Sequence, residues 1–470
     1  MAETFDVVVI GGGPGGYAAA LYGAAAGLSV AVVEQDKVGG TCLHRGCIPA
    51  KEFLETAATF RHVNEAKEFG ISTDSPTIDF GVSQARKQKV VDQLWKGLQG
   101  LMKRRKITTV HGKGSLAPNR TVKVSDGTEL KGTHVILAAG SVPRTIPGFE
   151  VDGKVVITSD EFLALDKLPA TAAVIGAGAI GCEFASTMAD LGVQVTLLEA
   201  LPKILPGCDR EVADVVVKSF TKRGINVRTG VAVKGHTPAG DGTGTTVDFG
   251  DDESVRVDVV VVAIGRRPMS DGLLEDGVVG VEIDERGFVR TDEWLRTGEE
   301  NVFAVGDVIN TGQGVHPALA HVGFAEGIQV IKTILGEPVF PVDYGKVPWC
   351  IYTYPEVAFA GYSEEVAKEA GYQVIVKKDP FAGNGRALIL GEPEGLVKVI
   401  AERTPDGRAG TILGVHMVGP WVTEQLGMAY LSVNWEATVD EVAQFIQPHP
   451  TLSEVFGETV LALTGRGLHT

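Results

Sequence analysis

The stretch Val7-Val8-Val9-Ile10-Gly11-Gly12-Gly13-Pro14-Gly15-Gly16 decides how the beginning of the chain folds. Its β-branched run predicts a buried strand, and the Ala-rich residues after the glycines predict a helix to about residue 27. A second predicted strand, residues 29–33, ends at Glu34. Strand, glycine turn, helix, strand and acid follow one another in this order in a Rossmann unit, which binds a dinucleotide.

The same order returns in the middle of the chain. A predicted strand at residues 172–175 leads into Gly176-Ala177-Gly178-Ala179-Ile180-Gly181, and the next predicted strand ends at Glu199. In both copies the acid follows the first glycine by 23 residues, from Gly11 to Glu34 and from Gly176 to Glu199. A single G-x-G-x-x-G is weak in a chain with 60 glycines, but two copies in matching context indicate an internal duplication with two dinucleotide sites.

The glycines and acids of these sites have distinct expected roles. The first glycine permits a tight turn, the second lets the backbone approach a pyrophosphate, and the third lets helix and strand pack closely. In the first copy these are Gly11, Gly13 and Gly16, and in the second Gly176, Gly178 and Gly181. Glu34 and Glu199 each suit a ribose 2′-hydroxyl and would repel a 2′-phosphate, so the second site is expected to prefer NAD over NADP. Without this context, the default interpretation of either acid would be an ordinary solvated glutamate on the surface.

Two of the five cysteines, Cys42 and Cys47, stand five positions apart within residues 39–51. A regular helix would separate them by about 7.5 Å along its axis, which exceeds the usual Cα span of a disulfide. Gly46 and Pro49 allow an irregular turn instead, with a helix that starts near Pro49 and favours a Cys47 thiolate. A metal site is the rival interpretation, although it lacks a second cysteine pair or a histidine cluster. The other cysteines are expected to be buried bystanders: Cys182, Cys208 and Cys350.

Two dinucleotide sites beside a redox-capable dithiol suggest a chain of electron carriers. A nicotinamide gives or takes two electrons as hydride, whereas a disulfide takes them through thiolates, and a flavin can exchange with both. The sequence therefore predicts FAD, NAD and a disulfide acting in series.

A histidine near the C-terminus has the surroundings of a base. His449 stands in Gln447-Pro448-His449-Pro450-Thr451-Leu452-Ser453-Glu454, where Pro450 keeps it out of helical geometry and is expected to start the next helix. Glu454 is placed to orient the ring, and thiol–disulfide exchange needs a base that works near neutral pH. The alternative is an ordinary surface or core-edge histidine.

Composition sets outer limits on function. The 470 residues suffice for about three domains. A net charge of −16 argues against nucleic acid as the main partner, and no apolar run is long enough to predict a membrane span. The acidic N-terminus resembles neither a secretory signal nor a transit peptide, so we expect a cytoplasmic protein or one already processed.

Taken together, these motifs resemble the class I pyridine nucleotide–disulfide oxidoreductases over essentially the whole chain. Residues 39–51 are similar to that family's highly specific G-G-x-C-x-x-x-G-C-x-P-x-K signature, and residues 449–454 match its H-P-T-x-x-E motif. The resemblance implies an α/β fold with two Rossmann-like domains, for FAD and NAD, and a C-terminal α+β dimerisation domain. The implied boundaries are 1–148 (FAD, first part), 149–270 (NAD), 271–345 (FAD and central, second part) and 346–470 (interface).

The resemblance also implies roles for individual residues. Cys47 would lie against the flavin, Cys42 would exchange with substrate, and Lys51 would sit near the flavin ring and pair with Glu183. His449 and Glu454 would act in the active site of the partner subunit of a homodimer. The implied FAD-lining residues are Gly114, Ala139, Gly140, Ser141, Asp307 and Ala320, and those on the nicotinamide side are Gly265 and Arg266.

Within the family, Glu199 and a C-terminal tail without cysteines favour the NAD-linked members that oxidise dihydrolipoamide on the lipoyl-bearing acyltransferase of 2-oxoacid dehydrogenase complexes. Three departures bear on this: His44 stands where Asn is usual, Gln447 replaces a common His, and Met269 follows Pro268 in place of Asn. Two other functions stay open, an NADH-dependent reductase of another disulfide and a flavin-binding scaffold or redox sensor that does not turn over.

Overall fold

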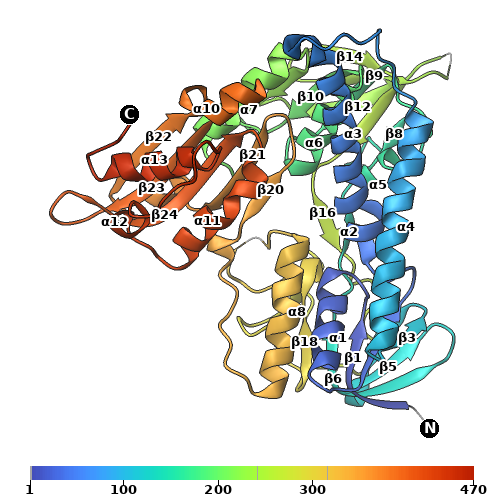
Figure 1. The fold of residues 1–470 in the computed structure, drawn as a ribbon. Helices are drawn as coiled ribbons and strands as arrows, with labels where there is room; N and C mark the ends of the chain where they lie inside the picture. The colour runs from blue at the N-terminus through green and yellow to red at the C-terminus, as the bar shows by residue number, and fades with distance from the viewer. Residues whose placement is uncertain (1–2, 241, 315, 470) are drawn as a thin grey trace.

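The structure, a computed structural model, describes residues 3–240, 242–314 and 316–469. Its elements gather around three large sheets, with the two chain ends far apart (Figure 1). No helix within the described ranges is both long and apolar enough to cross a membrane.

The first sheet carries the N-terminal glycine loop at the carboxyl ends of its strands. Val7, Val8 and Val9 are completely buried in its central strand, as their β-branched side chains favour. The strands follow the order β3 (Thr108–His111), β2 (Val30–Glu34), β1 (Glu3–Ile10), β6 (Glu129–Leu137), β5 (Thr121–Val124) and β4 (Gly114–Ala117), and β18 (Val302–Ala304) also pairs with β6. The β3, β2, β1, β6 and β18 pairings are parallel, so the ends of β1 and β2 lie side by side.

Helices cover this sheet and bring in the cysteines. Helix α1 (Pro14–Ala25) lies against α8 (Ala320–Leu335), and the approach is close because Gly15 faces Gly323, where a Cβ would come within 3.1 Å of the Gly15 nitrogen (Figure 1). Three further helices run along one side of the molecule: α2 (Gly40–Arg45), α3 (Cys47–Glu65) and α4 (Phe80–Arg104).

The second sheet is wholly parallel and carries the second glycine loop. Its order is β11 (Asn226–Thr229), β10 (Gln194–Glu199), β9 (Thr171–Ile175), β15 (Val259–Val262) and β8 (Val156–Ile157). Its helices are α5 (Ser159–Phe162), α6 (Ala179–Asp190) and α7 (Arg210–Lys222), and an antiparallel sheet of β12 (Val233–Pro238), β13 (Thr245–Phe249) and β14 (Glu253–Val257) is attached. A two-stranded link of β7 (Ser141–Pro143) and β16 (Arg266–Pro268) joins this unit to the first, and β17 (Val289–Arg290) pairs with β19 (Ile309–Asn310).

The third sheet is antiparallel and belongs to the C-terminal part of the chain. Its order is β20 (Trp349–Ile351), β21 (Glu356–Gly361), β24 (Ala409–Gly419), β23 (Leu396–Arg403) and β22 (Val374–Pro380). Its helices are α9 (Glu364–Glu369), α10 (Gly385–Leu390), α11 (Val422–Asn434), α12 (Val439–Val442) and α13 (Glu454–Leu463). Two Rossmann-like units and a C-terminal α+β part were predicted from the sequence, and the observed architecture confirms that fold class. The four domain boundaries stay predictions.

One predicted helix start agrees with the structure and one differs from it. Helix α3 begins at Cys47, near Pro49 as predicted, and the non-helical Gly46 before it accepts the amide of Ala50 at 3.0 Å with its carbonyl. Pro49 therefore sits inside the first turn, where its missing N–H costs nothing. Helix α13 begins at Glu454 rather than at Pro450, because residues 448–453 are bends and irregular structure that lead into it.

Candidate active site

The two glycine loops have the same backbone geometry. Gly11 has φ +104° and Gly176 has φ +99°, a region that L side chains rarely adopt. A Cβ at Gly11 would overlap the carbonyl of Ala138, and one at Gly176 would overlap the carbonyl of Ala263. Only glycine fits either position, so the internal duplication seen in the sequence extends to the backbone.

The third glycine of each motif lets its helix begin directly against the strand. A Cβ on Gly16 would collide with the carbonyl oxygen of Gly11, and one on Gly181 would collide with that of Gly176. The amino ends of α1 and α6 consequently point at the carboxyl edges of their sheets, where an anion gains from the free amides and the helix dipole.

The acids at the strand ends are held by the loops themselves. Glu34 Oε2 accepts the amide of Gly12 at 2.7 Å, and Glu199 Oε2 accepts the amide of Ala177 at 2.6 Å. In both cases Oε1 accepts a second amide, two residues further along the chain, at 2.8 Å. A carboxylate has about four lone-pair sites, so each acid can still accept a ribose hydroxyl.

A cavity of about 450 Å³ opens at the carboxyl edge of the first sheet. It runs from Glu34 at the end of β2 to the cysteine pair on α2 and α3. The sequence-predicted site residues that line it are Gly11, Gly13, Glu34, Cys42, Cys47, Lys51, Gly114, Ala139, Gly140, Ser141, Glu183, Arg266, Asp307 and Ala320. Residues predicted from motifs far apart in the sequence therefore meet at one cavity.

The two cysteines lie on the wall of this cavity with unbridged sulfurs that share a hydrogen bond. That bond from Cys42 lowers the pKa of Cys47 to about 7, against the opposing effect of burial, and the positive charge of Lys51 adds to the lowering. The same bond and burial raise the pKa of Cys42 far above its usual range. Cys47 is thus the sulfur that exists as a thiolate near neutral pH, and Cys42 is its proton donor.

A lysine–glutamate pair stands beside the sulfurs. Lys51 Nζ lies 2.9 Å from both carboxylate oxygens of Glu183, which is itself 3% exposed and also accepts the amide of Tyr352 at 3.0 Å. Burial would lower the pKa of Lys51, but the charge of Glu183 and its hydrogen bonds raise it overall. A permanent ammonium therefore lies at the cavity wall next to Cys47.

The nearby polar wall is built from three chain segments. Ser141 Oγ donates to Asp307 Oδ2 at 2.5 Å, and the Arg266 guanidinium donates to both the Oγ and the carbonyl of Ser141 at 2.7 Å. Arg266 was expected on the nicotinamide side. The structure places it in the same cavity as Ser141 and Asp307, at the β7–β16 link.

The other predicted residues lie apart from this cavity. Gly176, Gly178, Gly181, Glu199 and Gly265 surround the edge of the second sheet, and Gly16 is buried behind its own loop. Helix α6 joins the two regions, because Ala179, Ile180 and Glu183 line the cavity while the helix starts at the second glycine loop.

His449 and Glu454 meet each other but are not among the residues lining this copy's cavity. The ring Nδ1 is 2.7 Å from Glu454 Oε1, and the Thr451 amide donates to Glu454 Oε2, also at 2.7 Å. The His449 side chain is 78% exposed, so its Nε2 is open to an approaching molecule. The structure therefore brings the two predicted residues together, at a place apart from the cavity of the same copy.

Sequence reasoning missed a buried group behind Asp307. The carboxylate of Glu326 is fully buried, accepts the amide of Gly306 at 2.6 Å and the hydroxyl of Tyr344 at 2.6 Å, and contacts His316 Nε2 at 2.8 Å. Burial, with the Glu326 charge, raises the pKa of Tyr344. These groups hold the turn that presents Asp307, and no local pattern in the sequence indicates them.

Cys350 was expected to be a buried bystander, yet it lines the cavity beside Trp349. Burial raises the pKa of its thiol to about 11, which keeps it protonated and poorly nucleophilic. Cys182 and Cys208 are buried, as expected. Within residues 3–240, 242–314 and 316–469, no group of three or more His, Cys, Asp or Glu side chains is arranged to hold a metal ion.

The residues around the cavity fit a flavin dinucleotide. The glycine loop offers free amides for a pyrophosphate, and Glu34 stands where a ribose would lie. Apolar side chains and glycines form much of the remaining wall, and Lys51 and Cys47 close the far end. A cavity of this volume and mixed lining falls within the range of cofactor sites.

Comparison with known proteins agrees with this geometry. Residues 5–327 match the family model described as pyridine nucleotide-disulphide oxidoreductase, and residues 347–460 match the dimerisation domain of the same family. The chain belongs to this family. The family that the sequence motifs resembled is therefore confirmed.

Several relatives are similar over their full length. A dihydrolipoyl dehydrogenase of Bacillus subtilis is 41% identical, with 100% of both chains covered. One from Thermus scotoductus is 39% identical, with 99% of both chains covered. Among solved structures, LpdA from Mycobacterium tuberculosis has a TM-score of 0.88 at 26% identity, covering 98% of this chain and 100% of that one. The HOCl-induced flavoprotein disulfide reductase RclA from Escherichia coli has a TM-score of 0.85, also at 26% identity and with the same coverage.

Proposed function

We propose that this chain is an NAD-linked dehydrogenase that oxidises dihydrolipoamide to lipoamide, with electrons passing through the Cys42–Cys47 disulfide and FAD to NAD. The observation that carries the proposal is the pairing of a low-pKa Cys47 with Lys51 on the wall of a cavity that begins at the first glycine loop. Full-length relatives named dihydrolipoyl dehydrogenase support this choice of substrate over other disulfides.

The two cysteines have different chemical roles in this proposal. A thiolate of dihydrolipoamide attacks Cys42 and displaces Cys47, and the second substrate thiol then displaces Cys42, which leaves lipoamide and two reduced cysteines. Cys47 is the better leaving group because its pKa is the lower of the two. The bound flavin supplies the two-electron link between a thiolate and a nicotinamide. The hydrogen bond from Cys42, with the charge of Lys51, keeps Cys47 ionised. Overall, two electrons and one proton reach NAD while a second proton is released.

The base of this reaction comes from a second copy of the chain. His449 takes the substrate thiol proton, and Glu454 holds the ring so that Nε2 faces outward. Large exposed side chains, including Trp435 (75% exposed) and Ile446 (97% exposed), lie on the same C-terminal part and favour burial against another subunit. The match of residues 347–460 to a dimerisation domain supports a homodimer.

The second glycine loop binds NAD in this proposal. Glu199 selects it over NADP, because a 2′-phosphate would meet a carboxylate that the Ala177 and Leu201 amides hold in place. The physiological substrate is a lipoyl group on the acyltransferase subunit of a 2-oxoacid dehydrogenase complex.

Steady-state oxidation of dihydrolipoamide with NAD and with NADP, run beside NADH-dependent reduction of a panel of other disulfides, tests the proposal. Efficient turnover of dihydrolipoamide with NAD supports it, and activity confined to the panel contradicts the substrate. Anaerobic titration with NADH should also produce a long-wavelength thiolate-to-flavin absorption band. Protein that binds no flavin, or shows no such band, would exclude a working dehydrogenase.

A further inference from the structure

A row of five side chains crosses the whole C-terminal sheet. Trp349, Phe359, His416, Lys398 and Lys378 are direct cross-strand neighbours on β20, β21, β24, β23 and β22, so they share one face of the sheet. The first three rings are stacked, with centroids 5.7 Å and then 5.0 Å apart and planes within 7° and 6° of parallel. Trp349 lines the cavity that holds Cys42 and Cys47 on its wall, so the row begins at that cavity.

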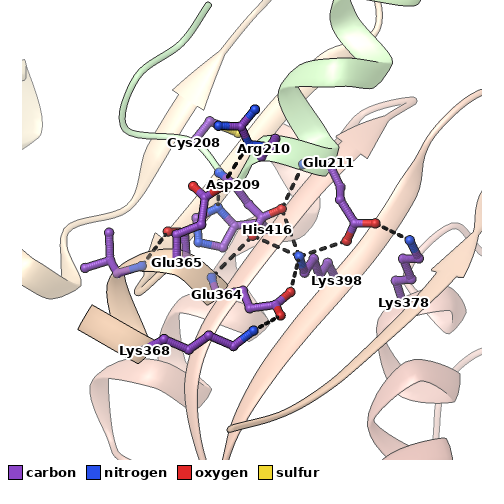
Figure 2. A network of polar contacts seen from close by, with 12 residues as sticks. Cys208, Asp209, Arg210, Glu211, Glu364, Glu365, Lys368, Lys378, Lys398 and His416 are labelled. Carbon is purple, nitrogen blue, oxygen red and sulfur yellow. Dashed lines mark hydrogen bonds and ion pairs between the residues drawn. The ribbon is translucent and has the colours of Figure 1, made fainter. Parts of the chain in front are cut away.

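At its other end the row meets helix α7 of the second Rossmann unit. Lys398 is 2% exposed, and its ammonium lies 3.0 Å from Asp209 and 2.8 Å from both Glu211 and Glu364 (Figure 2). Burial would lower the pKa of Lys398, but these carboxylates raise it overall. Asp209 is 1% exposed and its amide donates to His416 Nδ1 at 3.2 Å. A buried charge with three partners tolerates few geometries, so this cluster fixes how α7 sits on the sheet.

The segment before α7 is fixed at its far end by the second glycine loop. The amide of Leu205 donates to the carbonyl of Ala177 at 2.8 Å, and the amide of Cys208 donates to the Leu205 carbonyl at 2.8 Å. Lys203 Nζ also donates to the Cys208 carbonyl at 2.8 Å. A continuous path of contacts therefore runs from the glycine loop to Asp209, Lys398 and the stacked rings.

We propose that Lys398 is a positioning residue for the nicotinamide dinucleotide: through Asp209 it fixes the second glycine loop relative to the cavity wall at Trp349. The inference rests on the proposed function of the two dinucleotide sites. The position of this loop should affect catalysis, because hydride transfer requires reacting atoms about 3–3.5 Å apart. A displacement of about 1 Å can lower the rate by a factor of about 100. Lys398 touches none of the reacting groups and acts through the segment that it anchors.

The sharpest variant removes both buried charges together. Lys398→Met with Asp209→Asn leaves no unpaired buried charge, and Asn at 209 can still cap α7. Glu211 and Glu364 are partly exposed and keep their own lysines, Lys378 and Lys368 (Figure 2). Asp209→Asn alone is the milder companion, because Lys398 then retains two carboxylates.

The matched control is Lys222→Met. Lys222 pairs with Glu394 at 2.6 Å and so also joins α7 to the C-terminal part, but at the other end of the helix and in an exposed position. It has no contact path to the second glycine loop comparable with that of Asp209. Loss of the Lys222 charge should leave the KM for NAD and kcat unchanged.

The measurements separate positioning from simple stabilisation. For each variant, the KM for NAD and kcat are compared with the rate at which dihydrolipoamide reduces the bound flavin in the absence of NAD. We expect the double variant to raise the KM for NAD about 10-fold and to lower kcat, and Asp209→Asn to raise the KM about 3-fold, with flavin content and the NAD-free step unchanged. A lower melting temperature with wild-type KM and kcat would overturn the proposal, as would equal losses in the NAD-free step.

If the double variant does not fold, Asp209→Asn decides alone, and a wild-type KM for NAD in that folded variant refutes the proposal. Failure of the proposed function is a different result. It would show in the wild-type protein, as absence of dihydrolipoamide turnover or of flavin, before any variant is compared.

Discussion

Lys51 Nζ lies 2.9 Å from each carboxylate oxygen of Glu183, and the two residues come from different Rossmann units, on α3 and α6. The pair holds a positive charge at the cavity wall beside Cys47. It also ties the helix that carries the cysteines to the helix that starts at the second glycine loop.

Lys51→Met should raise the pKa of Cys47 from about 7 by about 1, since the lysine charge is lost and the buried Glu183 carboxylate remains. The check is the pH at which the thiolate-to-flavin band of two-electron-reduced protein disappears. The band requires the Cys47 thiolate and is therefore seen only above the pKa of Cys47. A higher pKa should move the midpoint of its loss to higher pH. Lys131→Met is the control, because Lys131 is exposed at the opposite end of β6. If the pH midpoint of the Lys51 variant does not move, the low pKa of Cys47 results from its hydrogen bond with Cys42 alone.

Much of this site follows from local spacing, whereas the rest depends on the tertiary fold. The glycine loops, Glu34, Glu199 and the cysteine motif are predictable because each is a short pattern tied to a strand end. The Lys51–Glu183 pair came only from family resemblance, since 132 positions separate its members. Glu326 with His316 and Tyr344, and Lys398 with Asp209, have no local signature at all, because the contacts exist only once separate elements have packed.

The misplaced start of α13 has a similar origin. Proline is common near helix starts, and the sequence pattern cannot tell which residue after Pro450 makes the first helical hydrogen bond. The position of Cys350 on the cavity wall was not predicted for a related reason, because it depends on how the third sheet packs against the first unit.

The duplicated glycines allow a paired experiment. Gly16→Ala and Gly181→Ala each force a methyl group into the carbonyl of the first glycine of the motif. Gly16→Ala should yield protein with little flavin, whereas Gly181→Ala should keep flavin and raise the KM for NAD at least 10-fold. Flavin absorbance and NAD-dependent kinetics measure the two effects. Gly97→Ala in α4, where a Cβ meets nothing within 4 Å, is the control and should be neutral or stabilising by about 1 kcal/mol. Identical phenotypes for the two loop variants would contradict separate sites.

Glu199 should decide the choice of nicotinamide. Glu199→Gln removes the negative charge and replaces one of the two acceptor oxygens with an NH2 group. The preference for NAD over NADP in kcat/KM should therefore fall by about 10-fold, roughly 1.4 kcal/mol. The measurement is the ratio of the two kcat/KM values. Glu34→Gln offers the internal comparison, because it should weaken flavin binding and leave that ratio alone. A ratio unchanged in Glu199→Gln would mean that another group rejects the 2′-phosphate.

His449→Gln should slow dihydrolipoamide oxidation by about 100-fold to 10,000-fold, the usual range for loss of a positioned base. Electron transfer from NADH to an artificial dye bypasses the thiols and should stay within about 2-fold of wild type. His469→Gln is a matched control, since His469 is 76% exposed and its Nδ1 contacts Glu458 at 3.2 Å, in imitation of the His449–Glu454 pair. Equal losses in both assays would show that His449 supports folding or assembly and not proton transfer.

His416 should make the protein acid-sensitive. Burial lowers its pKa to about 4, against an unfolded value of about 6.5, and the groups facing the ring are Asp209, Lys398 and Lys203. Because the folded pKa is depressed, the unfolded chain takes up a proton below pH 6.5 while the folded chain does not until about pH 4. The wild-type protein should therefore lose roughly 1 kcal/mol of stability per pH unit across that window through this residue. His416→Asn retains an acceptor for the Asp209 amide but cannot titrate. It should be less stable than wild type at pH 7.5, and the gap between the two urea midpoints should narrow steadily towards pH 4.5. Neighbouring carboxylates titrate in both proteins and cancel in that difference. A gap that stays constant with pH would therefore mean that His416 takes up its proton with the same pKa in the folded and the unfolded chain.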